Sequence, residues 1–175
     1  RSPDIRAAAA SQLGEAADPR AIEPLLACLA LEGDSKARNA ALDALFHMKS
    51  GRTVDLIIAL MEKDHGGSIA LGAAMALGKL GDRRAVEPLL RAARANPIFS
   101  ITQPAAIALG QIGDPSVVDR TLPDLKDKDP AIRSAAAMIL GWMKDSRACE
   151  PLATTMLKDS NTDVKEWATS AMGNL

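Results

Sequence analysis

Apolar residues recur along this chain in two kinds of helical segment that alternate. One kind, at 5–14 and 132–141, is rich in alanine, and its core positions lie nine, five, two and one residues before a glycine and are apolar except for Gln12. The other kind, at 18–26, 82–90 and 145–152, begins with an aspartate and carries a proline near its start. Apolar residues three and four positions apart share one face of a helix, so each segment is predicted to be an amphipathic α-helix.

The two kinds of helix repeat with a period of 31 or 32 residues. One amphipathic helix pair cannot bury its apolar face alone, so this period predicts an array of stacked pairs. We expect an all-α solenoid of about five and a half repeats in one domain, residues 1–175, excised from or trimmed at both ends of a longer chain. It would open on a second-type helix and contain eleven helices. The marker positions are Gly14, Phe46, Gly78, Gly110, Gly141 and Gly173.

Aspartates are expected to cap both kinds of helix, because a carboxylate accepts hydrogen bonds from the free N–H groups at a helix start. Before second-type helices an arginine follows the aspartate by four residues, as in Asp34 with Arg38 and Asp129 with Arg133. We expect the arginine to bind its capping aspartate, so that the pair has a structural role. First-type helices have their aspartate four residues after the glycine, at Asp18, Asp82 and Asp145.

These motifs resemble a known family. The glycine–aspartate turn, the Glu-Pro-Leu-Leu segment at 87–90 and the Ile-Arg-x-x-Ala-Ala-x-x-Leu-Gly segment at 132–141 look like HEAT-like repeats of the phycobilisome-lyase type. The resemblance covers the whole chain and implies a right-handed superhelix whose second helices line the concave face. It defines a fold more than a function, since the same repeat occurs in scaffolds, adaptors and a few enzymes.

Two residues depart from the repeat. Phe46 stands where the other units have glycine. We interpret it as drift in a tolerant repeat rather than as a change of curvature that shapes a groove. Pro104 falls at the start of a second-type helix or inside it. We expect an early-turn position capped by Thr102 or Gln103, since a proline inside a helix would kink it.

The outward positions of the second-type helices become apolar from the third unit onward. An exposed apolar stripe usually marks an interaction site, and tryptophan is enriched at binding hot spots. The competing interpretation is that these side chains fold against their neighbours, above all Trp167 in the last unit. We predict a concave partner-binding groove formed by Leu71, Met75, Lys79, Phe99, Gln103, Ile107, Gln111, Met138, Trp142 and Trp167.

Composition narrows the chemistry. A net charge of -1 argues against a nucleic-acid partner, because such proteins carry a basic stripe. Two histidines and two well-separated cysteines predict no metal site and no disulfide. Asp43 and His47 are expected to form a surface ion pair. We find no motif for a catalytic residue or a cofactor, no membrane-spanning stretch and no signal peptide, so a cytoplasmic protein is expected.

The sequence therefore favours a non-catalytic interaction or scaffold module that binds a protein or peptide segment in its groove. The alternative follows from the resemblance: phycobilin-lyase subunits hold an open-chain tetrapyrrole and pass it to a phycobiliprotein cysteine. A bilin carries two propionates, whereas the predicted groove offers only Lys79 as a cation. The last helix lacks a polar cap, so self-association through the ends is a further possibility.

Overall fold

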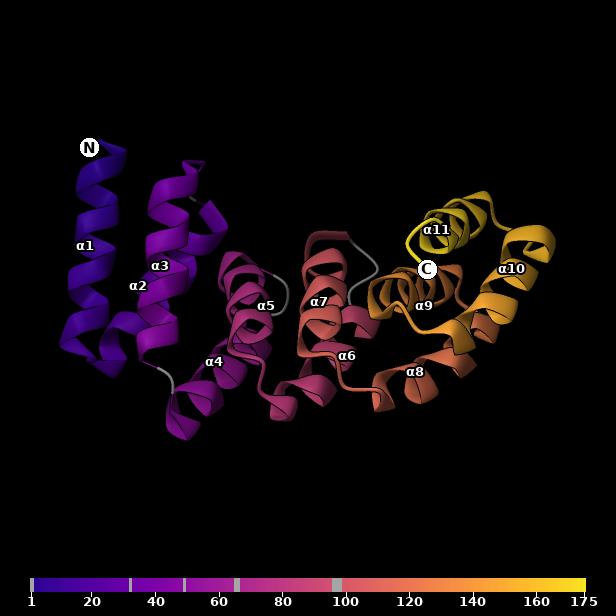
Figure 1. The fold of residues 1–175 in the computed structure, drawn as a ribbon, viewed down its shortest axis with the longest axis horizontal. Helices are drawn as coiled ribbons and strands as arrows, with labels where there is room; N and C mark the ends of the chain where they lie inside the picture. Colours follow the sequence, from indigo (N-terminus) through magenta and orange to yellow (C-terminus); the bar gives the residue numbers. More distant parts are fainter. Residues whose placement is uncertain (1, 32, 49, 65–66, 96–98) are drawn as a thin grey trace.

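The computed structural model describes residues 2–31, 33–48, 50–64, 67–95 and 99–175. Within these residues the chain forms eleven α-helices and four short 3-10 segments, with no strand. The helices stack as one curved row of pairs (Figure 1). The predicted all-α solenoid, which opens on a second-type helix, is confirmed.

The helices alternate between two roles. In Figure 1, the first-type helices α4, α6 and α8 lie along the outer side of the arc, so the second-type helices line its inner, concave side. The second-type helices are α1 (Pro3–Ala16), α3 (Ser35–His47), α5 (Ser68–Leu80), α7 (Phe99–Ile112), α9 (Pro130–Met143) and α11 (Thr162–Met172). The first-type helices are α2 (Ile22–Leu31), α4 (Gly51–Lys63), α6 (Val86–Ala95), α8 (Ser116–Thr121) and α10 (Cys149–Lys158). The 3-10 segments are η1 (Pro19–Ala21), η2 (Arg83–Ala85), η3 (Leu122–Lys126) and η4 (Ser146–Ala148).

Side-chain caps begin both kinds of helix, as predicted. Asp82 Oδ1 accepts a hydrogen bond of 3.0 Å from the backbone N–H of Arg84 at the start of η2. Asp129 Oδ1 accepts one of 2.8 Å from the N–H of Ala131 at the start of α9. These bonds satisfy N–H groups that have no partner inside the helix. The capping aspartates that recur in the sequence therefore mark where successive helices begin.

The marker glycines bring successive second-type helices into backbone contact. A Cβ atom on Gly14 would lie 2.7 Å from Ala44 Cα, and one on Gly141 would lie 2.8 Å from Ala171 Cα. Carbon atoms that are not bonded do not approach this closely, so each contact excludes any side chain. The closeness of neighbouring layers thus depends on the absence of a side chain at one position per repeat.

The contact between α7 and α9 has a different register. At the other marker glycines, the residue of the next second-type helix that faces the glycine lies two positions before the next marker, as Ala44 and Ala171 do. A Cβ on Gly110 would instead lie 2.7 Å from the carbonyl oxygen of Trp142, one position after Gly141. The shift of three residues corresponds to about 4.5 Å along a helix axis. It coincides with the shortest repeat and with α8, which has six residues.

Phe46 changes the stacking, so the interpretation as neutral drift is wrong. Phe46 is 43% exposed and stands where glycine elsewhere allows close approach. Its ring prevents that approach, and α5 makes little contact with α3. Instead α5 packs tightly on α2, where a Cβ added to Gly72 would overlap the carbonyl oxygen of Leu26. The concave face therefore opens between α3 and α5.

Pro104 lies inside α7, so the expected early-turn position is wrong. The helix begins at Phe99, ahead of Thr102 and Gln103, which were expected to cap it. Proline has no N–H, so Pro104 leaves the carbonyl of Ser100 without its usual helical donor.

The core runs through the array as two clusters of buried residues that meet at α9. Ile139 packs with the larger cluster, which extends back to α1, and Leu140 packs with the smaller one around α10 and α11. Because these clusters connect neighbouring layers only, the array buries its apolar residues step by step. Of the helices described, none is both long and apolar enough to pass through a lipid bilayer.

We expect Gly72→Ala to destabilise the fold by about 1–3 kcal/mol, because the new methyl group would overlap a backbone carbonyl that cannot rotate away. Urea denaturation followed by circular dichroism measures this loss. Gly33→Ala is the matched control, since a Cβ on Gly33 would meet no atom within 4 Å. Equal stability of the two variants would contradict the tight packing of α5 on α2.

Candidate binding groove

A pocket of about 320 Å³ opens on the concave face between α3, α5 and α7. We call it the α3–α5–α7 pocket. Its floor is apolar, and amide groups and an ammonium group stand at its rim. The lining residues are Leu42, Met75, Lys79, Gln103, Pro104, Ile107, Ala108 and Gln111.

The pocket brings together half of the residues predicted for the groove, namely Met75, Lys79, Gln103, Ile107 and Gln111. Met75 and Ile107 are half-buried, whereas the three polar side chains are exposed. Residues four apart share a helix face, so Met75 with Lys79, and Gln103 with Ile107 and Gln111, present one face of each helix to the pocket.

Leu42 lines the pocket but was not predicted. It lies four residues before Phe46, and the equivalent alanines Ala74, Ala106 and Ala137 are each 0% exposed. The repeat alone therefore assigns this position to the core. Leu42 stays half-buried because α5 packs on α2 and leaves this side of α3 open. The feature of the sequence that could have revealed Leu42 is Phe46, because its bulk in place of glycine predicts that α5 cannot pack closely on α3.

Met138 does not line a groove, which corrects the prediction for this residue. It is 4% exposed and packs in the larger core cluster. Its position in the repeat faces outward in α5 and α7, where Met75 and Ile107 occupy it. The register shift at Gly110 moves α9 along α7, and Met138 becomes part of the contact between layers.

The other predicted groove residues lie outside the α3–α5–α7 pocket. Trp142 is 39% exposed on α9, the next layer after α7. Trp167 is half-buried on α11 and packs against both core clusters. Leu71 is half-buried on α5, and the side chain of Phe99 is outside the described residues. The predicted continuous stripe is thus divided into a pocket and a separate tryptophan edge.

The concave face is acidic nearer the N-terminus. A second pocket of about 320 Å³ between α1 and α3 includes Glu15, Asp43 and His47 in its lining. His47 Nδ1 lies 2.7 Å from the backbone carbonyl oxygen of Asp43, so the expected contact with the Asp43 carboxylate is not formed. The described residues contain no group of three His, Cys, Asp or Glu side chains arranged to hold a metal ion.

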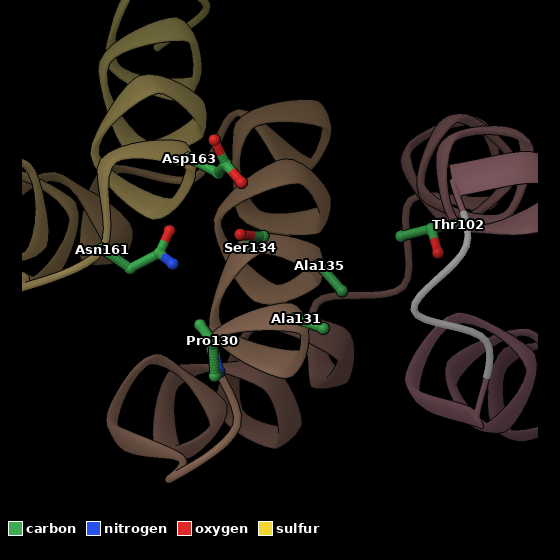
Figure 2. A pocket seen from close by; sticks show the side chains of 7 residues that line it. All are labelled: Thr102, Pro130, Ala131, Ser134, Ala135, Asn161 and Asp163. Carbon is green, nitrogen blue, oxygen red and sulfur yellow. The ribbon is translucent and has the colours of Figure 1, made fainter.

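A smaller pocket of about 210 Å³ lies at the start of α9 (Figure 2). Figure 2 shows Asn161 and Asp163 on one side of α9 and Thr102 on the other. Asn161 Oδ1 already accepts a hydrogen bond of 3.1 Å from Val164 N, which caps α11. Ser134 is 5% exposed. Its apolar lining consists of Pro130, Ala131 and Ala135, so this pocket offers less apolar surface to a partner side chain than the α3–α5–α7 pocket.

Arg133 binds a different aspartate from the one predicted. Its Nε and Nη2 groups donate to Asp159 Oδ2 and Oδ1 at 2.8 Å and 2.9 Å, and Nη1 donates to the carbonyl of Asp127 at 2.8 Å. The carboxylate of the capping residue Asp129 instead accepts a hydrogen bond from the backbone N–H of Ala131 in α9. The side chains of Arg133 and Asp159 are only 12% and 8% exposed. This ion pair ties α9 to the end of α10 and leaves Arg133 unavailable to a ligand.

The Arg133 guanidinium lowers the pKa of Asp159 below its ordinary value of 3.8, mainly through the side-chain hydrogen bonds. Burial acts in the opposite direction, and the backbone N–H of Asn161 adds to the lowering. The hydrogen bonds prevail because both carboxylate oxygens accept from the guanidinium.

The fold and the pocket together define an α-solenoid repeat protein with an open concave groove. Models of HEAT repeats match residues 32–103 and 99–173, and the model of the PBS lyase HEAT-like repeat matches residues 5–30. The chain belongs to the HEAT-repeat family.

No curated protein matches this chain. A solved chain from the complex of CpcE and CpcF of phycocyanin lyase from Nostoc sp. PCC7120 is 20% identical with a TM-score of 0.59, covering 88% of this chain and 99% of that one. Human deoxyhypusine hydroxylase in complex with glycerol is 16% identical with a TM-score of 0.46, covering 99% of this chain and 80% of that one. At these identities the first similarity shows the fold alone, and the second carries no argument.

We expect Asp159→Asn to lower the free energy of unfolding by about 2 kcal/mol at pH 7, because the guanidinium of Arg133 loses a charged acceptor. The native pKa of Asp159 lies below its unfolded value, so the wild-type carboxylate stabilises the fold above pH 3.8 and loses this effect as the pH falls through the native pKa. Urea titrations from pH 7 to 3 should show the difference narrowing below pH 3.8. The control Glu166→Gln alters an exposed carboxylate on the neighbouring helix α11. If it lowers the free energy of unfolding as much as Asp159→Asn does, the stabilising role of the ion pair is contradicted.

Proposed function

We propose that this protein is a non-catalytic interaction module that binds a segment of a partner protein in the α3–α5–α7 pocket. The observation that carries the proposal is the convergence of Leu42, Met75 and Ile107 beneath a rim of Lys79, Gln103 and Gln111. Burying a partner's apolar side chain on this floor removes apolar surface from water and stabilises the complex.

The rim suits the main chain or the acidic groups of a bound segment. Glutamine amides donate and accept hydrogen bonds, and the Lys79 ammonium donates to carbonyl or carboxylate oxygens. Met75 has a flexible, polarisable side chain that adapts to irregular partner surfaces. An amphipathic helix laid along the concave face would use the pocket for one apolar anchor and the exposed edge of Trp142 for another.

The similar solved chain supports a protein partner, since it comes from a complex of CpcE and CpcF. Stacked repeats present long surfaces of this kind to other proteins.

A second candidate function is the binding of an open-chain tetrapyrrole, favoured by the fold shared with a phycocyanin lyase chain. The electrostatics of the pocket weaken this candidate. Among the described lining residues, Lys79 supplies the positive charge, and Arg133 is bound to Asp159. Two propionates would leave one carboxylate without a cation, which makes binding less favourable.

Selection of a peptide-display library on the wild-type chain should return segments with an apolar anchor. Ile107→Glu places a carboxylate on the pocket floor, and we expect it to weaken a selected peptide about 30-fold, equivalent to about 2 kcal/mol, measured by fluorescence anisotropy. Lys79→Glu, at an exposed position, should weaken peptides that carry an acidic residue.

The matched control is Leu157→Glu, which introduces the same charge at an apolar position on α10 that is 69% exposed and outside the pocket. The affinity of Leu157→Glu for the selected peptides should equal that of the wild type. If Ile107→Glu and Leu157→Glu bind the selected peptides equally well while both stay helical, the pocket is not the site.

Mixing the protein with a bilin distinguishes the two candidate functions. The interaction module is expected to leave the visible absorption spectrum of the pigment unchanged, because the pocket lacks a second cation. A shifted and intensified absorption band that is lost in Lys79→Ala would place the tetrapyrrole function first.

A further inference from the structure

A groove of about 840 Å³ opens between two neighbouring first-type elements of the array. One wall is α8 with the segment η3 that continues it, and the other wall is α10. We call it the α8–α10 groove. Both walls lie inside the described chain and belong to successive layers, so the groove is a feature of one step between layers rather than of an end of the array.

An ion pair joins the walls at the equivalent steps between earlier layers. In each layer the residue twelve positions after the capping residue of the first-type helix reaches the next first-type element. Glu62 Oε1 of α4 pairs with Arg91 Nη2 of α6, and Arg94 Nε of α6 donates to Asp124 Oδ2 of η3 at 2.7 Å. The partners stand nine and ten positions after the next capping residue.

The step from η3 to α10 places threonines where earlier steps have the charged partner. Lys126 is twelve positions after its capping residue, and the positions nine and ten after the next one are Thr154 and Thr155. All three residues line the α8–α10 groove. Thr155 Oγ1 donates to the carbonyl of Pro151 within α10 at 3.0 Å. Two short hydroxyl side chains therefore face Lys126 across the groove, and neither can neutralise its charge.

Two carboxylates that line the groove are already bound to arginines. Arg147 Nη1 donates to Asp119 Oδ1 at 2.7 Å, beside the start of α10. Both carboxylate oxygens of Asp159 accept hydrogen bonds from Arg133 at the far end of α10. These two ion pairs hold the ends of the groove in place and contribute little net charge to it.

The remaining charges give the groove a positive end. Lys126 and Lys158 are exposed and are the last residues of η3 and α10. Glu150 lies in the first turn of α10, eight residues before Lys158, which corresponds to about 12 Å along the helix axis. A carboxylate that enters the groove is therefore attracted to the end with the two ammonium groups.

Apolar side chains lie between the two ends of the groove. Leu125 is 6% exposed, and Leu122 and Pro151 are half-buried. An apolar side chain placed on these residues would leave water, which favours binding. The groove thus combines an apolar floor with a cationic end that has lost its partner within the repeat.

We propose that the α8–α10 groove docks a segment of a partner protein in which an acidic residue lies close to an apolar residue. The carboxylate binds Lys126 and Lys158, and so takes the place of the carboxylate that the equivalent arginine of α6 binds. The apolar side chain lies on Leu122 and Leu125. This groove shares no residue with the α3–α5–α7 pocket, so the inference does not depend on the proposed function.

The test begins with a random peptide-display library. The library is first depleted on the double variant Lys126→Glu, Lys158→Glu and then selected on the wild-type chain. Depletion removes peptides that bind the α3–α5–α7 pocket, because the double variant retains that pocket. A failure of the proposed function therefore leaves this selection unaffected. We expect the selected peptides to carry an aspartate or glutamate next to or near an apolar residue.

Fluorescence anisotropy then measures the affinity of a selected peptide for single variants. Lys126→Glu should weaken binding about tenfold, because two negative charges would face each other across the interface. Exchange of the acidic residue of the peptide for lysine should restore binding to Lys126→Glu. The matched control is Lys128→Glu, which makes the same charge change at an exposed lysine outside the groove and should bind as the wild type does.

Thr154→Asp tests the missing ion pair directly. It places a carboxylate at the exposed position that Arg91 occupies in α6, where it can pair with Lys126 and compete with the ligand. We expect it to weaken peptide binding severalfold. Thr154→Asn adds a side chain of the same shape without the charge, and should leave the affinity unchanged.

Three results would overturn the proposal. One is a selection in which no peptide survives the depletion, or in which the surviving peptides lack an acidic residue. Another is binding that Lys126→Glu and Thr154→Asp leave unchanged while circular dichroism shows both variants folded. The third is self-association of the chain alone that Lys126→Glu abolishes in analytical ultracentrifugation, because a second copy rather than a partner segment would then occupy the groove.

Discussion

The backbone contact between successive second-type helices is the constraint on which the rest of the structure depends. At Gly14 and Gly141 the facing helix comes so close that even a methyl group would overlap its atoms. This close approach buries the alanine-rich helix faces, because alanine side chains are too small to fill a wider gap between the helices. A closely packed inner row beside a row of first-type helices produces the curved array of Figure 1.

The α3–α5–α7 pocket arises where this contact is altered. Phe46 keeps α3 away from α5, and the opening exposes Leu42 beside Met75 and Ile107. The shift at Gly110 has the opposite effect, since it brings Met138 into the core. A repeat array thus acquires a localised apolar pocket through one oversized residue in an otherwise small-residue interface.

Ion pairs between layers decide which charges remain available to partners. Arg84, Arg133 and Arg147 each bind carboxylates from a neighbouring element. Lys79 at the pocket and Arg20 in η1 are exposed cations, and Arg20 pairs with its own capping aspartate Asp18. Lys79 stands beside the half-buried Met75 and Ile107, where a partner would remove water from charge and apolar surface together.

The sequence by itself determined the helices, the aspartate caps such as Asp82 and Asp129, and the helix faces that carry Met75, Lys79, Ile107 and Gln111. These features follow from spacing within one helix and from the repeat period, which are local properties of the chain. Only the tertiary structure decided that Met138 is buried, that Leu42 lines the pocket and that Arg133 binds Asp159. Each of these depends on how far one helix slides or turns against its neighbour, and that displacement is set by side chains meeting across the interface rather than by the periodicity of either helix.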